Sequence, residues 1–409
     1  MRVKHPDAEI ETWADVRAES SEIRRDGCAL SNEGCAISNT VGVEDLDTFR
    51  EPQRQFAHVE VPAPDPRPWP RDERPLEASV VGAGRELGLE EFLAVTSSTS
   101  CVVVVDGVLV HEWYAEGVTA DDRLLGNSAT KSALALLTGV AVTRGQLSDL
   151  DVPVGELVPQ LAPGGYAEVT LRQVLTMTTG VGWVEDYHDP DSAASAMIGR
   201  WREGRGGTRE QLPGIPAGDT PGTRYSYCSP DSMVLDWVRE RATGTTYPEA
   251  LAELWRTLGA EQAAVLGLDA PVEAGGVAMA AAALAVTARD WARIGWLQVD
   301  GTWDGRPVVD RSWVEASSRP ARPFLRPGRL PSTITTHAGF GYHWWPTTDD
   351  GSRVMADGMR GQFVYVDRPR RTVVVKTSAW PYADPWWDRQ CRDLCYLGLP
   401  AIAEAAAQS

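Results

Sequence analysis

The chain has 409 residues and a formal net charge of −18. This length allows a large core and two lobes, while the negative charge disfavours nucleic acid and anionic membranes as partners. No apolar run is long enough to span a bilayer, and the first residues, Met1 to Glu9, contain no apolar signal segment. We therefore expect a cytoplasmic protein, monomer or homodimer, that binds neither nucleic acid nor a membrane.

The cysteines and histidines form no metal-binding pattern. There are six of each in the chain. The cysteine spacing matches no zinc site and is too sparse for a disulfide framework. The histidines form no His-Glu-x-x-His set. We expect no metal and no cofactor.

The first 75 residues have the weakest patterns, and the stretch 61–70 is expected to form an arm across the surface. Residues 9–22 favour a short charged helix. Residues 61–70 contain prolines at a spacing that excludes both a helix and a central strand. A helix near residues 87–95 follows the arm.

A hairpin and a buried helix come next. The segments 101–105 and 108–114 are rich in β-branched residues and flank Asp106-Gly107, which predicts a tight turn. Residues 133–142 are apolar nearly all round, as in a helix at the centre of a protein. Asn127 or Ser128 can cap the start of this helix, and Gly145 can end it.

Ser128 and Lys131 have the spacing of a nucleophile and its base. They lie three residues apart, on one face of the predicted helix and near its N-terminal end. A serine hydroxyl needs a neighbouring base, and a desolvated lysine can be that base. The chain has only three lysines, Lys4, Lys131 and Lys376, and arginine cannot replace lysine in this role. The alternative is a helix-capping serine beside a structural lysine.

The remaining elements place strands at both ends of a helical middle. Residues 149–160 are expected to form a short connection, and a helix with Thr170 as its N-cap is expected to run to Gly180. Further helices are predicted at 231–243, 276–299 and 385–406, and strands at 339–345, 362–366 and 372–376. This order predicts one sheet built from both ends of the chain, with a helical lobe inserted.

Three ordered segments resemble the penicillin-recognising serine hydrolases, closest to their 6-aminohexanoate-dimer hydrolase and esterase branch. The first is Ser128-Ala129-Thr130-Lys131. The second is the helix that begins at Thr170. The third is Tyr227-Cys228-Ser229, with serine where the β-lactamases have asparagine. The resemblance covers roughly residues 95–400. It implies an α/β (α+β) fold of the β-lactamase/transpeptidase type, with an antiparallel sheet flanked by helices.

The resemblance also implies the limits of the lobes. Residues 1–90 would be an arm and first helices that pack on the core. Residues 91–127 and 305–409 would form the sheet lobe, and residues 128–304 the mostly helical lobe.

The lysine of the family's Lys-Thr-Gly motif is missing. Lys376-Thr377-Ser378 lies one strand too late, while Gly358-Met359-Arg360-Gly361-Gln362 is in the expected place. Because the missing lysine would help to hold a β-lactam carboxylate, we expect β-lactams to be poor substrates. The segment 183–190 also resembles the amide-hydrolase branch.

The resemblance assigns roles to individual residues. Ser128 would be the acylated nucleophile of a small amide or ester substrate, with Lys131 and Tyr227 moving its proton. The backbone N–H groups of Ser128 and Gln362 would form the oxyanion hole. Supporting and substrate-binding roles fall to Ser229, Gly361, Trp183, Tyr187, Trp344 and Trp345. Two alternatives stay open, a transacylase that uses the same acyl-enzyme and an inactive penicillin-binding-like protein.

Overall fold

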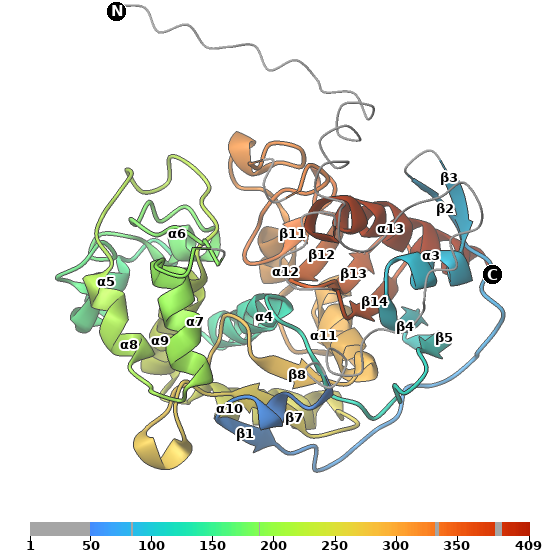
Figure 1. Cartoon of the computed structure of the whole chain (residues 1–409), viewed down its shortest axis with the longest axis horizontal. Coiled ribbons are helices and arrows are strands. Elements are labelled where there is room, and N and C mark those ends of the chain that lie inside the picture. The colour runs from blue at the N-terminus through green and yellow to red at the C-terminus, as the bar shows by residue number, and fades with distance from the viewer. Residues whose placement is uncertain (1–49, 83–84, 188, 332–334, 381–386) are drawn as a thin grey trace, which may run out of the picture. The chain divides into compact units, whose positions relative to one another are not determined.

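The structure of the chain is a computed structural model that describes residues 50–82, 85–187, 189–331, 335–380 and 387–409 (Figure 1). The described residues belong to one unit, which spans Thr40–Ser409. The helix expected at residues 9–22 lies outside the described part of the chain.

The central sheet has six strands in the order β11-β12-β13-β14-β4-β5, and all neighbours are antiparallel. Its strands are β4 (Ser98–Val105), β5 (Val108–Tyr114), β11 (Trp345–Pro346), β12 (Arg353–Gly358), β13 (Gln362–Asp367) and β14 (Thr372–Ser378). β4 and β5 form the hairpin expected around Asp106-Gly107. Val103 of β4 pairs with Val374 of β14. The prediction that both ends of the chain build one sheet is confirmed.

Helices cover both faces of this sheet. Successive residues of a strand point to opposite faces, and the two faces of β4 accordingly belong to two separate apolar cores. Val102 and Val104 pack in the core that contains α4 (Ala129–Thr143) and α11 (Ala288–Asp300). Cys101 and Val103 pack in the core that contains α13 (Arg392–Gln408). A strand buried on both faces reads as a continuous apolar run, as residues 101–105 do.

α4 connects the sheet with the helical lobe. It contacts β12 and β13 on one side and α9 on the other (Figure 1). The other helices are α3 (Leu89–Val95), α5 (Val154–Leu157), α6 (Leu171–Leu175), α7 (Ala193–Arg202), α8 (Thr208–Gln211), α9 (Ser229–Thr243), α10 (Tyr247–Leu258) and α12 (Arg311–Ser318). Short 3-10 turns occur at Pro52–Arg54, Pro159–Leu161, Leu212–Gly214, Val272–Ala274 and Pro323–Leu325, and a π-helical turn at Trp387–Cys391 precedes α13. Both α4 and α11 lie within residues 128–304, and both pack on the central sheet. The limits of the two lobes stay a prediction.

A second sheet of four strands lies beside α10 (Figure 1). Its order is β1-β7-β8-β6, with β1 (His58–Val61), β6 (Leu124–Leu125), β7 (Ala264–Gly267) and β8 (Leu284–Val286). One of its strands, β6, directly precedes α4 in the sequence. Two hairpins complete the strands, β2 (Ser79–Gly82) with β3 (Arg85–Gly88) and β9 (Thr302–Trp303) with β10 (Arg306–Pro307). Residues 62–70, after β1, form neither helix nor strand, as their prolines predict.

The helix expected at residues 276–299 is wrong in its first half. Residues 284–286 are strand β8, which pairs with β6 and β7. Alanine favours helices, but pairing within a buried sheet overrides this weak preference. The helix begins only after Thr287, whose side chain accepts a hydrogen bond from the backbone N–H of Asp290 and so caps α11.

Two other predicted elements also differ. α6 starts with the expected Thr170 cap but ends at Leu175, because Met177 adopts a positive φ of 49°. The strand expected at residues 339–345 is reduced to Trp345–Pro346. His343, within this segment, adopts a positive φ of 56°, which lies outside the extended region of a strand. Strand β12 was not predicted.

Candidate active site

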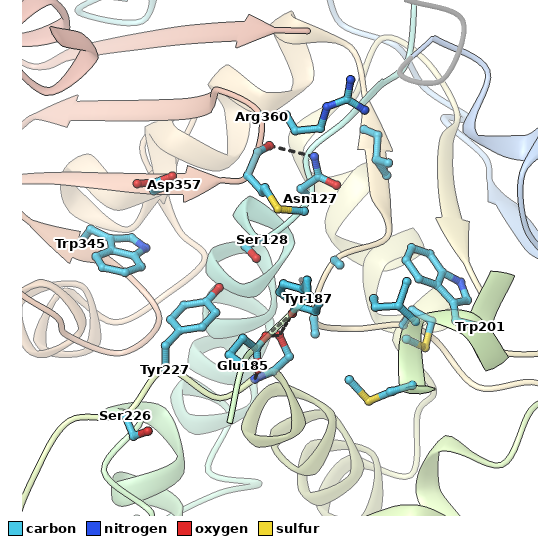
Figure 2. A pocket seen from close by; sticks show the side chains of 18 of the residues that line it. Asn127, Ser128, Glu185, Tyr187, Trp201, Ser226, Tyr227, Trp345, Asp357 and Arg360 are labelled. Atoms are coloured by element: carbon cyan, nitrogen blue, oxygen red, sulfur yellow. Dashed lines mark hydrogen bonds between the residues drawn. The ribbon is translucent and has the colours of Figure 1, made fainter. Parts of the chain in front are cut away.

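Ser128 lies at the N-terminal end of α4 and lines a cavity of about 800 Å³ (Figure 2). Most of α4 is buried, as its apolar sequence predicts. The predicted side-chain cap is wrong, because neither Asn127 nor Ser128 caps the helix. Asn127, at a φ of 45°, instead donates from Nδ2 to the backbone oxygen of Met359 at 2.9 Å. The Ser128 hydroxyl therefore remains available to other partners.

Lys131 is a basic group in direct contact with the Ser128 hydroxyl. Its Nζ lies 3.1 Å from Oγ of Ser128, 3.1 Å from Oγ of Ser229 and 2.8 Å from the backbone oxygen of Ala281. Burial of the ammonium lowers the pKa of Lys131 to about 8, although the negative charge of Glu185 opposes the shift. A substantial fraction of this lysine is therefore neutral at mildly alkaline pH.

Tyr227 lies beside both groups. Its ring is 5.0 Å from Nζ of Lys131 and stacks on Trp345, with the ring centroids 6.0 Å apart. Burial, with the negative charge of Glu185, raises the pKa of Tyr227 well above its usual value, while a hydrogen bond with Ser128 acts in the opposite direction. The phenol therefore keeps its proton at neutral pH.

Glu185 organises this group of residues and was not identified from the sequence. Its carboxylate accepts hydrogen bonds from the backbone N–H of Ser229 at 3.0 Å and from Nε1 of Trp183 at 2.6 Å. The hydroxyls of Ser229 and Tyr187 also donate to it. A single acidic residue in a loop forms no motif, so only its neighbours in space reveal it (Figure 2). Ser229 is placed as expected, bonded to Lys131.

Gln362, expected to be an oxyanion donor through its backbone N–H, is not among the residues that line the described cavity. Its side chain donates to the backbone oxygens of Arg360 and Ser378, at 3.0 and 2.7 Å. Among the described residues that line the cavity, the β12–β13 turn contributes Met359 and Arg360 but neither Gln362 nor Gly361. Gly361 instead faces Trp380.

Gly358 explains how this turn reaches the nucleophile. A Cβ atom at this position would lie 2.1 Å from the backbone oxygen of Gly126 and 3.1 Å from the backbone nitrogen of Ala129. Only glycine permits this approach of β12 to the start of α4. The bond from Asn127 then fixes Met359 beside Ser128.

Two of the four aromatic residues that were predicted to bind substrate line the cavity. Tyr187 and Trp345 do so. Trp344 is fully buried in the core, and Trp183 is half-buried and directs its indole N–H to Glu185, so neither belongs to the lining that the structure describes. Phe56 and Trp201 line the cavity and were missed, since each is an isolated aromatic residue without a pattern.

Strand β12 carries an acidic residue next to its C-terminal end. Asp357, the penultimate residue of β12, lines the cavity and is buried. It forms an ion pair with Arg392 of α13 and accepts a hydrogen bond from the hydroxyl of Tyr396 at 3.0 Å. Asp357 therefore reaches the cavity as one half of an ion pair.

Two kinds of feature are absent from the described residues. No three His, Cys, Asp or Glu side chains among them gather as metal ligands. None of the helices described combines the length and the apolar character needed to cross a membrane.

Comparisons with known proteins identify the family of the chain. Residues 89–386 match the family model described as Beta-lactamase. The chain is 32% identical over 304 residues to the 6-aminohexanoate-dimer hydrolase of Paenarthrobacter ureafaciens. The aligned part covers 72% of this chain and 76% of that protein.

Two solved structures show the same fold. One, from Bacillus anthracis, is provisionally named a 6-aminohexanoate-dimer hydrolase; it has a TM-score of 0.74 at 19% identity and covers 90% of this chain and 95% of that one. The other is a family VIII carboxylesterase, with a TM-score of 0.54 at 16% identity, covering 76% of this chain and 91% of that one. The predicted fold class is thereby confirmed. The chain belongs to the Beta-lactamase family and is a serine hydrolase.

Proposed function

We propose that the protein cleaves a small amide or ester through an acyl-enzyme on Ser128. The observation that carries this proposal is the 3.1 Å contact between Nζ of Lys131 and Oγ of Ser128, at a cavity and in a place where burial lowers the pKa of the lysine. A structural lysine that only neutralises a buried charge would not need a cavity beside it.

Lys131 is the proposed base, rather than Tyr227. A phenol whose pKa is raised has no phenolate to accept a proton at neutral pH. Neutral Lys131 takes the proton of Ser128 while Oγ attacks the substrate carbonyl carbon. Tyr227, which lines the cavity beside Lys131, donates a proton to the leaving amine or alcohol, and the protonated lysine then reprotonates the phenolate. The C–N or C–O bond of the substrate breaks and the acyl group stays on Ser128.

Met359 replaces Gln362 in the proposed oxyanion hole. The backbone N–H groups of Ser128 and Met359 come from the two segments that the Asn127 hydrogen bond joins. Each such donor contributes about 3 kcal/mol to stabilising the transition state. Water then attacks the acyl carbon, with Lys131 as base, and releases the carboxylic acid.

Glu185 and Ser229 position the base. The hydroxyl of Ser229 donates to Glu185 and accepts from Lys131, so the lysine has a fixed orientation toward Ser128. The charge of Glu185 also keeps the pKa of Lys131 from falling further. The names of the similar proteins, a dimer hydrolase and a carboxylesterase, support amide and ester bonds as the target.

Covalent labelling tests the nucleophile. We expect a fluorophosphonate to modify Ser128, identified by mass spectrometry, and Ser128→Ala to abolish both labelling and p-nitrophenyl ester hydrolysis. Ser132→Ala is a matched control on the same helix, because its hydroxyl donates to the backbone of His343 at 2.6 Å and is buried away from the cavity. It should still be labelled. An adduct on another residue, with Ser128 unmodified, would overturn the proposal.

A further inference from the structure

One end of the cavity is apolar. The apolar lining includes Trp201, its ring partner Phe56 and its neighbours on α7, and comprises Phe56, Leu125, Met197, Ile198, Trp201 and Met279. In Figure 2, Trp201 lies on the opposite side of Ser128 from Tyr227 and Trp345. The nucleophile therefore stands between an apolar end and an end that contains Tyr227, Trp345 and Asp357.

The apolar wall is tightly held. The rings of Phe56 and Trp201 are in contact, with centroids 4.8 Å apart and planes at 33°. Phe56 also packs against Gly267 of β7, where a Cβ atom would lie 2.7 Å from the phenyl ring. Met279 and Leu125 are buried and belong to the same apolar core as these rings. Such a wall favours an apolar group of matching shape, because apolar area leaves water there.

The carboxylates that line the cavity already have hydrogen-bond or ion-pair partners within the protein. In the described lining they are Glu185 and Asp357. Glu185 accepts four hydrogen bonds at the Lys131 side, and Asp357 is paired with Arg392 at the far end. The charged residue that α7 contributes to the lining is Arg202, a cation. An ammonium group placed at the apolar end would therefore lose its water without gaining a counter-ion, which is costly.

We infer that the acyl part of the substrate is an uncharged, apolar chain or ring that occupies the pocket of Phe56 and Trp201. This inference rests on the proposed acyl-enzyme. Because Tyr227 is the proposed donor to the leaving group, the leaving group lies on the Tyr227 and Trp345 side, which leaves the apolar end for the acyl group. A 6-aminohexanoyl group, which ends in an ammonium, fits this end poorly.

Two esters that differ at one position test the inference. p-Nitrophenyl heptanoate and p-nitrophenyl 6-aminohexanoate have the same leaving group and equal chain length, with a terminal methyl in one and an ammonium in the other. We expect kcat/KM to favour the heptanoate by at least ~30-fold at pH 7, within the range of about 10- to 200-fold that an apolar pocket achieves for one small group. Equal rates, or a preference for the amine, would overturn the inference.

Variants of the wall sharpen the same test. Ile198→Asp introduces a carboxylate at a half-buried position of the wall and should reduce the preference for heptanoate at least ~10-fold. Trp201→Ala should weaken heptanoate turnover more than acetate turnover. Val81→Ala, at an exposed position on β2, should change neither ratio. An unchanged ratio in a folded Ile198→Asp variant would contradict the inference.

Ser128→Ala separates the two proposals. If ester hydrolysis persists in this variant, the proposed function fails, whatever the ratio of the two esters. If hydrolysis depends on Ser128 but the wild-type protein does not prefer heptanoate, only the acyl-group inference fails.

Discussion

Two of the described lysines are buried beside serine hydroxyls and aromatic rings, and the serine beside one of them, Ser128, lines the described cavity. Nζ of Lys131 lies 3.1 Å from Oγ of Ser128 and 5.0 Å from the ring centre of Tyr227. Nζ of Lys376 lies 2.6 Å from Oγ of Ser378 and 5.7 Å from the ring centre of Trp380. As isolated groups of side chains the two sets look alike.

Their surroundings differ in access. Lys376 is in the middle of β14, covered on its side of the sheet by α13 and the ring of Phe92. Neither Lys376 nor Ser378 belongs to the described lining of the cavity, whereas Ser128 does. Contact between a lysine and a serine is therefore not enough for catalysis. A substrate must also be able to reach the serine. The following predictions test this difference.

Lys131→Arg should have the largest effect. Arginine keeps the positive charge and much of the aliphatic stem but cannot give up its proton. Ester hydrolysis should fall at least ~100-fold, the lower end for the loss of a general base, with a nearly unchanged melting temperature. Initial rates and thermal melts of both proteins measure this. A normally folded variant that keeps more than a tenth of the activity would show that the lysine is not the base.

Lys376→Ala should affect stability and not chemistry. Removing a fully buried side chain leaves a cavity and removes a hydrogen-bond partner of Ser378, so the free energy of unfolding should fall by about 2–4 kcal/mol. The rate per folded molecule should stay within ~2-fold of wild type. Denaturant unfolding and active-site titration measure the two quantities. A large loss of rate in folded protein would give Lys376 a role that its position does not indicate.

Glu185→Gln should give the smallest change, a shift in pH dependence. Activity needs neutral Lys131, so kcat/KM should rise with pH around the lysine pKa of about 8. The charge of Glu185 raises that pKa, and its removal should move the midpoint to lower pH. Profiles of kcat/KM against pH measure the shift, with Lys376→Ala as a control that keeps the wild-type midpoint. A shift to higher pH would contradict the assignment.

The sequence predicted the elements that have strong local patterns. The β4–β5 hairpin follows from Asp106-Gly107, and the buried helix α4 with its Ser128–Lys131 pair follows from spacing. The missed parts depend on contacts between distant segments. β8 is a strand because β6 and β7 pair with it, and Met359 reaches Ser128 because Gly358 permits close packing. Glu185 and Trp201 have no pattern in the sequence at all.

The position of β4 has a consequence for how the chain folds during synthesis. β4 and β5 are made early, yet the other neighbour of β4 is β14, more than 250 residues later in the sequence. Until residues 372–378 leave the ribosome, the β14-facing edge of β4 has no native partner. Such an edge is a template for pairing with other chains. Slow translation or truncation before β14 should therefore favour aggregation, and binding of chaperones to the nascent chain should centre on residues 98–105.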